Sequence, residues 1–506
     1  MFRRRQQLEA KRMIMKRNKN TWSFVRRNSI FCGSFFFLLL LLAIVGGCVP
    51  PSGTDRVFTQ RMADPQKDPL HTARLSCFLN LKDDRGPAIR LEVSGIEVVS
   101  DVSTLQLIRE PLKIDSTEIG AGQLFLGGMA LPPGNYRQLR LTVTKGEVKN
   151  TAGIYEDLIS EPLSVAVNFN PGLSLESEDS SSLLITWDVK NSLLSDNVLD
   201  PVLTASPSLR QMLLNLVFVT CPEIDTVFVV RTDKNWVVDS FGLKGRPTYI
   251  AINPSDRNIL YVLCSRDRMV KAVDLSSFRV INFFQVPLND EPTYMTISPD
   301  GKIAFLLDER NGYLSRVNLT TGSIEARVLL GDRPIYAAYL QEQNLLAVSL
   351  SLSQKVLLLN PASLGVIRSI STGNGPQGLI VIDNQLFLAE SRDNAISVTD
   401  LTTRGTQNRL MVGFDPRRLL GSESKQIFVS NYQDGSISIL YADQVGVIRE
   451  IYGLGRPLEM ALNAFYHRLY VTDEMMAALA VIDTESNRLV DYIALGARPF
   501  DLDVIQ

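Results

Sequence analysis

The chain has 506 residues, of which 45% are hydrophobic and 21% are charged, as in ordinary globular proteins. Its net charge of -2 conceals an uneven distribution, because residues 1–47 contain ten Lys and Arg side chains and only one acid. The rest of the chain has 42 basic and 53 acidic side chains, a net charge of about -11. An acidic body excludes a general nucleic-acid-binding protein, which needs a basic surface.

The N-terminal segment has the pattern of a secretion signal. Its basic part precedes eleven consecutive apolar residues, 35–45, which are too few to cross a bilayer as a helix. The run ends in a sequence that resembles a bacterial lipobox, Val45-Gly46-Gly47-Cys48. We therefore predict a signal peptide over residues 1–47 and a lipidated Cys48. The alternative is a short membrane anchor with an incidental cysteine.

The residue after the lipobox bears on the destination of the protein. Val49 stands where an aspartate would signal retention in the inner membrane, which favours the outer membrane in a cell with two membranes. We expect a lipid-anchored protein of the bacterial cell envelope, on the periplasmic or the surface side. Residues 48–69 are predicted to be a tether.

Residues 70–196 are predicted to form a β-sandwich. Alternating apolar and polar stretches, such as AIRLEVSGIEVV and LLITWDVK, are typical of strands, and turns with Pro and Gly separate them. The stretch LPPGNYRQLRL, residues 131–141, is similar to a motif in a bacterial lipoprotein domain of unknown function that typically follows a lipobox. Residues 197–213 are expected to be a linker.

The C-terminal half contains a repeat of roughly 42 residues, marked by loops similar to Gly-x-x-Pro. Four short strands follow each loop, which is the layout of a β-propeller blade. Gly accepts a positive φ and Pro takes a position without a ladder N–H, so together they turn the chain between blades. The seven prolines are Pro247, Pro292, Pro334, Pro376, Pro416, Pro457 and Pro499.

Short polar side chains are predicted to cap the third strands of five blades. Such side chains can bond the backbone of the turn that follows. They are Asp274, Asn318, Asn360, Asp400 and Asp483.

The repeat is predicted to close into a seven-bladed ring. The chain enters it at about Leu216 with a second strand, LVFVTC, and its last stretch, RPFDLDVIQ, is an inner strand. These two incomplete units make one blade, so pairing of the last strand with the first blade leaves no sheet edge open. The predicted fold is all-β, with a propeller over residues 214–506 after the sandwich.

The propeller region resembles a known repeat family. Residues 470–473, YVTD, and 428–431, FVSN, together with the Gly-x-x-Pro loops, are similar to YVTN-type β-propeller repeats of bacterial surface and periplasmic proteins. The resemblance covers residues 216–506 and implies the propeller fold. It implies no activity, because that family is mostly uncharacterised.

Few residues offer catalytic or metal-binding chemistry. His71 and His467 are too few for the His-rich metal sites of propeller enzymes, and no CxxC or G-x-S-x-G motif occurs. Residues 373–378, GNGPQG, match G-x-G-x-x-G but have no following helix to receive a phosphate. The acidic loop 176–179 is expected to be a solvated turn, with a cation site as the alternative. We expect no catalytic residue, metal or cofactor.

Arginines recur beside the loop prolines, where the inner strands begin. A partial ring of guanidinium groups at a channel mouth would hold an anion, a carboxylated glycan or an acidic partner loop. The alternative is structural pairing with Asp308, Glu390, Asn431 and Asp473, which end second strands on the same face. The candidate binding residues are Arg246, Arg333, Arg417, Arg456 and Arg498.

Three cysteines follow the lipobox: Cys77, Cys221 and Cys264. Cys221 and Cys264 occupy the same position in adjacent blades, so a disulfide between them is one prediction for an oxidising compartment. A blade separation beyond the limit for a disulfide is the alternative.

These features predict a lipid-anchored binding or scaffold protein of the cell envelope. The propeller would present a face to an envelope protein or an anionic glycan. The alternative is a propeller enzyme, a hydrolase or lyase acting on sugar or lactone substrates, which the shortage of histidine disfavours.

Overall fold

The structure is a computed structural model that describes residues 72–505, except 83–85, 195–196, 208–213, 287–291, 404–405 and 445. The predicted signal peptide, lipobox and tether, including Val45, Gly46, Gly47 and Cys48, lie outside the described residues, as does His71. Among the described residues, no helix has both the length and the apolar character needed to span a bilayer.

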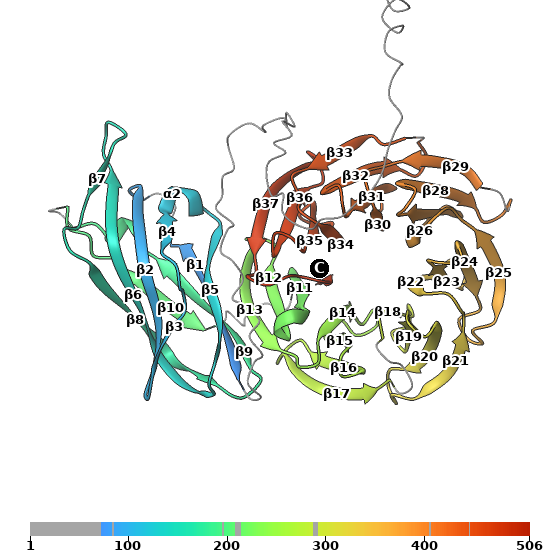
Figure 1. The fold of residues 1–506 in the computed structure, drawn as a ribbon, viewed down its shortest axis with the longest axis horizontal. Coiled ribbons are helices and arrows are strands. Elements are labelled where there is room, and N and C mark those ends of the chain that lie inside the picture. The colour runs from blue at the N-terminus through green and yellow to red at the C-terminus, as the bar shows by residue number, and fades with distance from the viewer. Residues whose placement is uncertain are drawn as a thin grey trace, which may run out of the picture. The chain divides into compact units, whose positions relative to one another are not determined.

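The first domain is a bent sheet of ten strands around one core (Figure 1). Along the sheet the order is β3 (Thr104–Gln106), β2 (Ile89–Ser100), β6 (Gly134–Lys149), β8 (Leu163–Leu175), β10 (Leu203–Pro207), β9 (Ser180–Trp187), β1 (Ala73–Leu81) and β5 (Gln123–Leu131). Two further strands lie off this path: β4 (Leu112–Asp115) pairs with β2, and β7 (Tyr155–Asp157) pairs with β6. A single residue pair, Ala205 with Phe169, joins β10 to β8. The two layers of the predicted sandwich thus meet along one edge, which makes a half-barrel. Short helices α2 (Ser116–Ile119) and η1 (Val189–Asn191) complete the domain.

The predicted linker contributes a strand to this domain. Within residues 197–213, β10 pairs antiparallel with β9, from Leu203 opposite Trp187 to Pro207 opposite Leu183. The strand has only five residues and ends in a proline, so its alternation was too short to separate from a linker pattern. The first domain therefore extends to Pro207, beyond the predicted boundary at residue 196.

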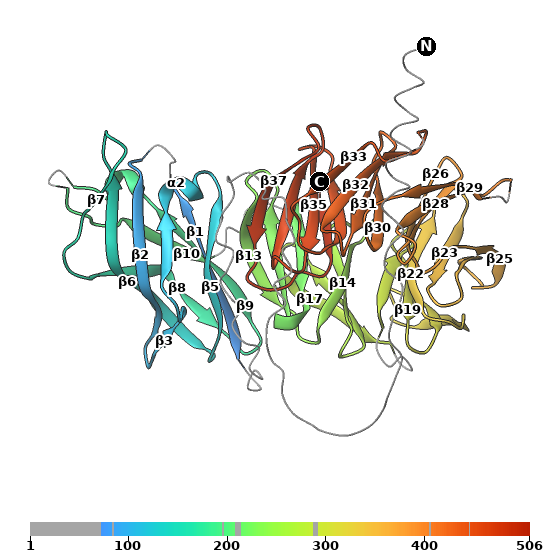
Figure 2. The same ribbon diagram turned by 45° about the horizontal axis from the view of Figure 1, so that its top comes forward.

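Residues 216–505 form seven four-stranded antiparallel sheets arranged as a ring (Figures 1 and 2). Blade 1 contains β38 (Leu502–Ile505), β11 (Leu216–Cys221), β12 (Thr226–Arg231) and β13 (Trp236–Gly242), with η2 (Pro222–Ile224) between β11 and β12. Blade 2 contains β14 (Pro247–Ile252), β15 (Ile259–Cys264), β16 (Met269–Asp274) and β17 (Arg279–Gln285). Blade 3 contains β18 (Tyr294–Ile297), β19 (Ile303–Asp308), β20 (Tyr313–Asn318) and β21 (Ile324–Leu329).

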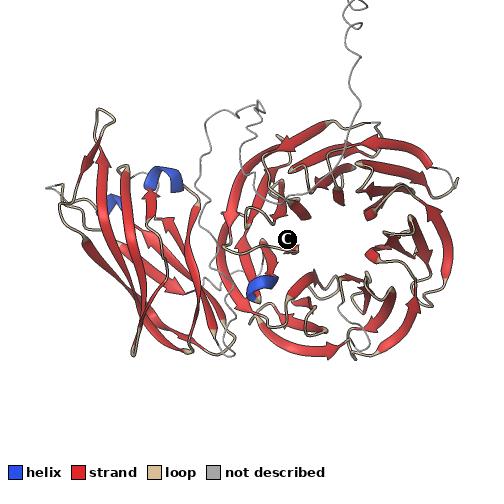
Figure 3. Cartoon of the chain, in the orientation of Figure 1, coloured by secondary structure: helices blue, strands red, loops and turns tan. Residues whose placement is uncertain are grey.

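The other four blades repeat this order from the inner to the outer strand. Blade 4 contains β22 (Pro334–Leu340), β23 (Leu345–Leu350), β24 (Lys355–Leu359) and β25 (Val366–Ser371), and blade 5 contains β26 (Pro376–Ile382), β27 (Gln385–Glu390), β28 (Ala395–Asp400) and β29 (Thr406–Met411). Blade 6 contains β30 (Pro416–Gly421), β31 (Gln426–Asn431), β32 (Ser436–Tyr441) and β33 (Arg449–Tyr452), and blade 7 contains β34 (Pro457–Asn463), β35 (Arg468–Asp473), β36 (Ala478–Asp483) and β37 (Arg488–Ala494). The predicted all-β fold with a seven-bladed propeller is confirmed (Figure 3).

Burial within a blade changes from the middle strands to the outer strand. Every residue of β19 and β35 except Arg468 is buried, because neighbouring blades cover both faces of the second strands. This explains apolar runs without alternation, such as IAFLLD. The outer strand β17, in contrast, is almost wholly exposed.

The five predicted turn caps are confirmed. Each accepts hydrogen bonds through Oδ1 from backbone N–H groups two or three residues later; the bond from Ser486 to Asp483 is 2.7 Å long. Hydrogen bonds from Ser276 and Ser277 also lower the pKa of Asp274 to about 2. These caps satisfy backbone donors at the turn where the chain passes from the third to the fourth strand.

The last strand closes the ring, as predicted. β38 pairs antiparallel with β11, from Leu216 opposite Ile505 to Val219 opposite Leu502. Two carboxylates extend the closure to blade 2: Asp501 Oδ2 accepts from the Ile250 N–H and Asp503 Oδ2 from the Ile252 N–H, both at 2.8 Å. The final strand therefore binds both the blade that it completes and the inner strand of the next blade.

The outer strand of blade 1 is covered by the first domain. The Gln123 side-chain amide donates to Val237 O (3.1 Å) and accepts from Val237 N (2.9 Å). Strand β1 serves two cores, because Cys77 faces the core of the half-barrel while Phe78 packs with propeller residues. A Cβ on Gly242 would lie 2.0 Å from Glu178 O, so this contact requires glycine.

Replacing Asp503 by asparagine tests the closure through its pH dependence. Removal from water raises the pKa of Asp503 to about 6 in the folded protein, whereas an unfolded Asp titrates near about 3.9. The folded state binds this proton more tightly, so the associated stability is present below about pH 4 and is lost as the pH rises through about 6. We expect the melting temperature of Asp503→Asn, relative to the unsubstituted protein, to rise between these pH values.

Thermal unfolding over this range measures the difference. The substitution Asp443→Asn, at an exposed turn far from the closure in the sequence, controls for the loss of a carboxylate. A difference between Asp503→Asn and the unsubstituted protein that stays constant with pH would contradict the expectation.

Candidate functional site

The inner strands place one residue of each blade at the same level near the ring axis. This residue stands two positions after each loop proline, and contacts between members of the set from different blades show that they meet. In blades 2 to 7 and then 1, the residues are Tyr249, Tyr294, Tyr336, Gly378, Arg418, Glu459 and Asp501. Three members of the set are aromatic, three are charged and one is glycine.

Arg418 reaches across the ring. Its side chain is only 8% exposed, and its Nε donates to Glu459 Oε1 at 2.6 Å on the neighbouring blade. Its Nη2 donates to Tyr249 Oη at 3.1 Å on blade 2, and its Nη1 to Arg417 O at 3.2 Å. Burial lowers the pKa of Arg418 and the charge of Glu459 raises it, and the resulting pKa lies well above the usual value. The guanidinium therefore stays charged, and its contacts extend from blade 6 to blades 7 and 2.

The three tyrosines form a continuous aromatic wall. The ring centroids of Tyr249 and Tyr294 lie 4.5 Å apart, and those of Tyr294 and Tyr336 lie 4.8 Å apart. The guanidinium carbon of Arg418 lies 5.1 Å from the Tyr336 ring centroid, within range of a cation–π interaction. Burial raises the pKa of all three phenols, so their hydroxyl groups remain protonated donors.

Gly378 provides the space that Arg418 needs. A Cβ at this position would lie 2.7 Å from Arg417 O and 3.0 Å from the Arg418 Cα. Any larger residue in blade 5 would displace the strand that carries the arginine. The absence of a side chain at Gly378 is therefore required by the position of the strand that carries Arg418.

Asp501 is the second carboxyl group of the set. It is 7% exposed, and Oδ1 accepts from the Leu502 N–H at 2.9 Å. Burial and the nearby charge of Glu459 raise the pKa of Asp501 well above its ordinary value. The axis thus holds an ion pair beside a carboxyl group that favours its protonated form.

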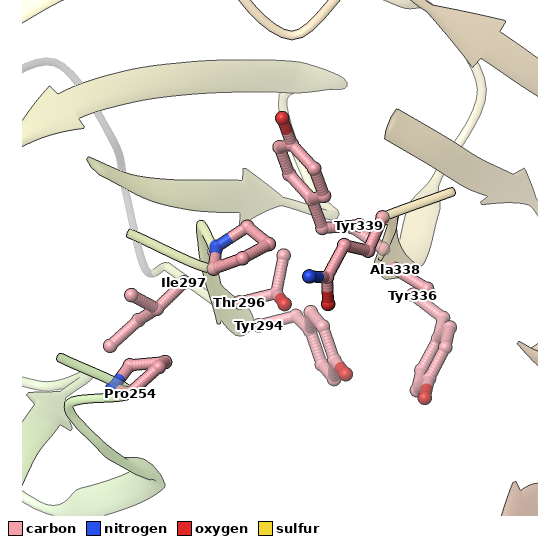
Figure 4. A pocket seen from close by; sticks show the side chains of 10 residues that line it. Pro254, Tyr294, Thr296, Ile297, Tyr336, Ala338 and Tyr339 are labelled. Carbon is pink, nitrogen blue, oxygen red and sulfur yellow. The ribbon is translucent and has the colours of Figure 1, made fainter. Parts of the chain in front are cut away.

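A cavity of about 420 Å³ lies beside the aromatic wall (Figure 4). Its lining contains no charged residue and consists of Pro254, Tyr294, Thr296, Ile297, Pro299, Tyr336, Ala337, Ala338, Tyr339 and Gln341. Tyr294 and Tyr336 extend in the same direction in Figure 4, and Tyr339 extends in the opposite one, toward Asn344. Because Pro254, Pro299 and Gln341 follow the inner strands, the cavity is at the end of the ring away from the Gly-x-x-Pro loops.

A second cavity of about 260 Å³ shares four lining residues with the first: Pro254, Tyr294, Thr296 and Ile297. It is also lined by Tyr249, Glu459 and Asp501. The two cavities are therefore neighbours, with an uncharged outer part and an inner part that reaches the carboxyl groups.

The five predicted arginines lie at the opposite end of the ring, beside the Gly-x-x-Pro loops. Three form ion pairs: Arg333 with Glu309, Arg417 with Asp415 at 2.8 Å, and Arg498 with Glu223 at 3.4 Å. The guanidinium carbons of Arg417 and Arg456 lie 4.3 and 5.7 Å from the ring centroid of Tyr432, and Arg246 is exposed. The binding role of the five arginines stays a prediction.

The carboxylates that end the second strands bind loop backbones. Asp473 accepts from the N–H groups of Gly455 (2.6 Å) and Arg456 (2.9 Å), and Glu390 accepts from that of Gly373 (2.6 Å). The ion pairs of the loop arginines instead use carboxylates within the loops. At residues 373–378 the protein's own carboxylates therefore occupy backbone donors, which agrees with the rejection of a phosphate site.

The predicted disulfide is not formed, because Cys77, Cys221 and Cys264 are free buried thiols. Cys221 packs in the core between blades 7 and 1, while Cys264 packs in the core between blades 1 and 2. Burial raises the pKa of Cys264 to about 12, so this thiol remains protonated. Among the described residues, no group of three or more His, Cys, Asp or Glu could hold a metal ion.

Comparison with known proteins supports the fold alone. No family model matches the chain, and no curated protein matches it. A functionally unknown protein from Desulfotomaculum acetoxidans DSM 771 has a similar structure, with 16% identity and a TM-score of 0.52 over 58% of this chain and 99% of that one.

Two further solved structures are less similar. Dihydro-heme d1 dehydrogenase NirN in complex with DHE has 15% identity and a TM-score of 0.46, covering 56% of this chain and 64% of its own. Kuenenia stuttgartiensis hydrazine synthase has 16% identity and a TM-score of 0.44, covering 50% of this chain and 88% of its own.

Replacing Arg418 tests whether the axial ion pair is a buried unit. Arg418→Met leaves the carboxylate of Glu459 buried without its partner, which we expect to lower the free energy of unfolding by about 3–5 kcal/mol. The double variant Arg418→Met/Glu459→Met removes both charges and should recover most of this loss. Urea unfolding measures all three proteins.

The adjacent residue provides the control. Arg417→Met removes a more exposed ion pair with Asp415, and such pairs are worth about 0–1 kcal/mol. Equal losses for Arg417→Met and Arg418→Met, or no recovery in the double variant, would refute a buried axial pair.

Proposed function

We propose that the protein is a cell-envelope binding protein whose propeller holds a small, neutral, hydroxyl-bearing ligand of one or two sugar rings. The observation that carries this proposal is the uncharged cavity of about 420 Å³ beside Tyr294 and Tyr336. Its volume is within the usual range for small-molecule sites. The absence of charge from its lining favours neutral ligands over anionic ones.

The lining offers both kinds of contact that a sugar needs. Aromatic rings give flat apolar surfaces for the C–H-bearing face of a sugar, and Ile297 and Pro299 extend this surface. The Thr296 hydroxyl can donate and accept hydrogen bonds, and the Gln341 amide offers two donors and an acceptor. A mostly apolar wall with few polar groups is typical of sites that orient a small ligand.

We propose binding rather than catalysis because neither of the nearby carboxyl groups, Glu459 and Asp501, lines the larger cavity. Glu459 is paired with Arg418, and both oxygens of Asp501 accept backbone N–H groups. A nucleophile or a general acid must instead reach the reacting atoms of its substrate. The arrangement therefore supports recognition better than it supports hydrolysis or elimination.

The proposed location rests on the sequence. A lipidated Cys48 after the signal peptide would hold the protein at the outer membrane, with residues 48–69 as a tether. An envelope protein is the proposed partner of the loop face that carries Arg246, Arg333 and Arg456. No nucleic-acid partner is proposed, because the body of the protein is acidic.

Titration of the detergent-solubilised full chain with glucose and maltose, followed by calorimetry and ligand-observed NMR, tests the ligand class. We expect saturable binding, weakened about tenfold (about 1.4 kcal/mol) by Tyr336→Ala and by Gln341→Ala, because both side chains line the cavity. Gln343→Ala, in the same turn but outside the cavity lining, should bind as the unsubstituted protein does. Failure of both sugars to bind would overturn the proposal.

Metabolic labelling with an alkyne fatty acid in a bacterial host tests the anchor. We expect the unsubstituted protein to be labelled and recovered with membranes, and Cys48→Ser to lose both properties because the acceptor thiol is gone. Cys32→Ser, within the predicted signal peptide, should keep both. Undiminished labelling of Cys48→Ser would refute the anchor.

A further inference from the structure

The inner cavity differs from the outer one in the groups that it presents. It measures about 260 Å³ and is lined by Tyr249, Tyr294, Glu459 and Asp501 together with apolar residues. The outer cavity presents hydroxyl and amide groups, whereas the inner one presents carboxyl oxygens against aromatic rings. A ligand that fills both would need one end that differs chemically from the other.

The carboxyl oxygens that line the inner cavity retain capacity to accept hydrogen bonds. Arg418 uses three of its five N–H groups, and only the one on Nε reaches Glu459, at Oε1. Among the described residues, none donates a hydrogen bond to Glu459 Oε2. In the ionised form of Asp501, each carboxylate oxygen accepts one backbone N–H and retains a free lone pair. The cavity is thus arranged to receive hydrogen-bond donors.

Charge and aromatic surface point to the same kind of group. Arg418 neutralises Glu459, so a cation would balance the second carboxyl group, Asp501, in its ionised form. The tyrosine rings add the electron-rich faces that attract cations. An anion would instead meet the carboxylate of Glu459, whereas Arg418 is not among the residues that line this cavity.

We propose that the inner cavity recognises an ammonium group, and that the ligand of this protein is an amino sugar or a comparable hydroxyl-bearing amine. This inference rests on the proposed function, because the neutral part of the ligand would occupy the outer cavity. The ammonium group would donate to Glu459 Oε2 and Asp501 and lie against Tyr249.

Binding of an ammonium group would be linked to proton release. The titratable groups that interact with Asp501 are Glu459 on β34, Asp503 on β38, Tyr249 on β14 and Tyr336 on β22, and the raised pKa of Asp501 favours its protonated form. A nearby ammonium lowers the pKa of a carboxyl group, so Asp501 would lose its proton when the ligand binds. The affinity for an amine should therefore increase as the pH rises and Asp501 ionises more readily, while that for a neutral sugar should not.

Calorimetry with glucosamine, N-acetylglucosamine and glucose on the detergent-solubilised full chain tests the inference. We expect glucosamine to bind about tenfold more tightly than the two neutral sugars. Glu459→Gln should remove this preference and leave the affinity for glucose unchanged. Glu342→Gln, which removes an exposed carboxylate outside both cavity linings, should change neither affinity.

The outcomes separate this inference from the proposed function. Equal affinities for the three sugars, or a glucosamine preference that survives in Glu459→Gln, would overturn the ammonium site while glucose binding upheld the proposed function. Failure of all three sugars to bind would overturn both. If Glu459→Gln does not fold, Asp501→Asn takes its place and is expected to abolish the pH dependence of glucosamine binding.

Discussion

Pairing of the last strand with the first blade is the constraint on which the rest of the propeller depends. The hydrogen bonds between Thr220 and Asp501 join residues that are 281 positions apart. The conformational entropy lost on bringing these residues together must therefore be overcome before the contacts between the two ends stabilise the fold. The axial contacts exist only in the closed ring, because Arg418 on blade 6 meets Tyr249 on blade 2 and Asp501 reaches Ile250. Closure of the ring therefore both stabilises the propeller and assembles the candidate site.

A repeating scaffold carries a site that does not repeat. All seven blades share the same strand order, yet the residues nearest the axis run from three tyrosines through a glycine to an arginine and two acids. Gly378 and Arg418 show how this asymmetry is used, since the space left by one accommodates the strand of the other. Equivalent positions in the repeats give the geometry, and differences between their side chains give the chemistry.

The blades could be predicted from the loop prolines, because positive-φ glycines and prolines have backbone requirements that hold regardless of context. The turn caps could be predicted for a similar reason, because each capping side chain bonds the backbone of its own turn. The axial site was not predicted. The sequence analysis names Arg417 because it adjoins Pro416, whereas the axial contacts are made by the next residue, Arg418. Alternation along a strand reverses the side to which neighbours point. Aligning the repeats on their prolines and reading two positions further would have found Arg418. The cavities, and the separate cores of Cys221 and Cys264, depend on packing that spacing does not encode.

The direction of β38 has a practical consequence for studies of this molecule. The inner strands run from the Gly-x-x-Pro loops toward the turn that contains Pro254, and Asp503 lies beside Ile252 near the end of that path. The C-terminal end of the described chain is thus inside the ring, as Figure 1 shows, at the end where the larger cavity lies. An affinity tag or fluorophore fused after Ile505 would emerge there and compete with ligands. Exposed turns between outer strands are better attachment points.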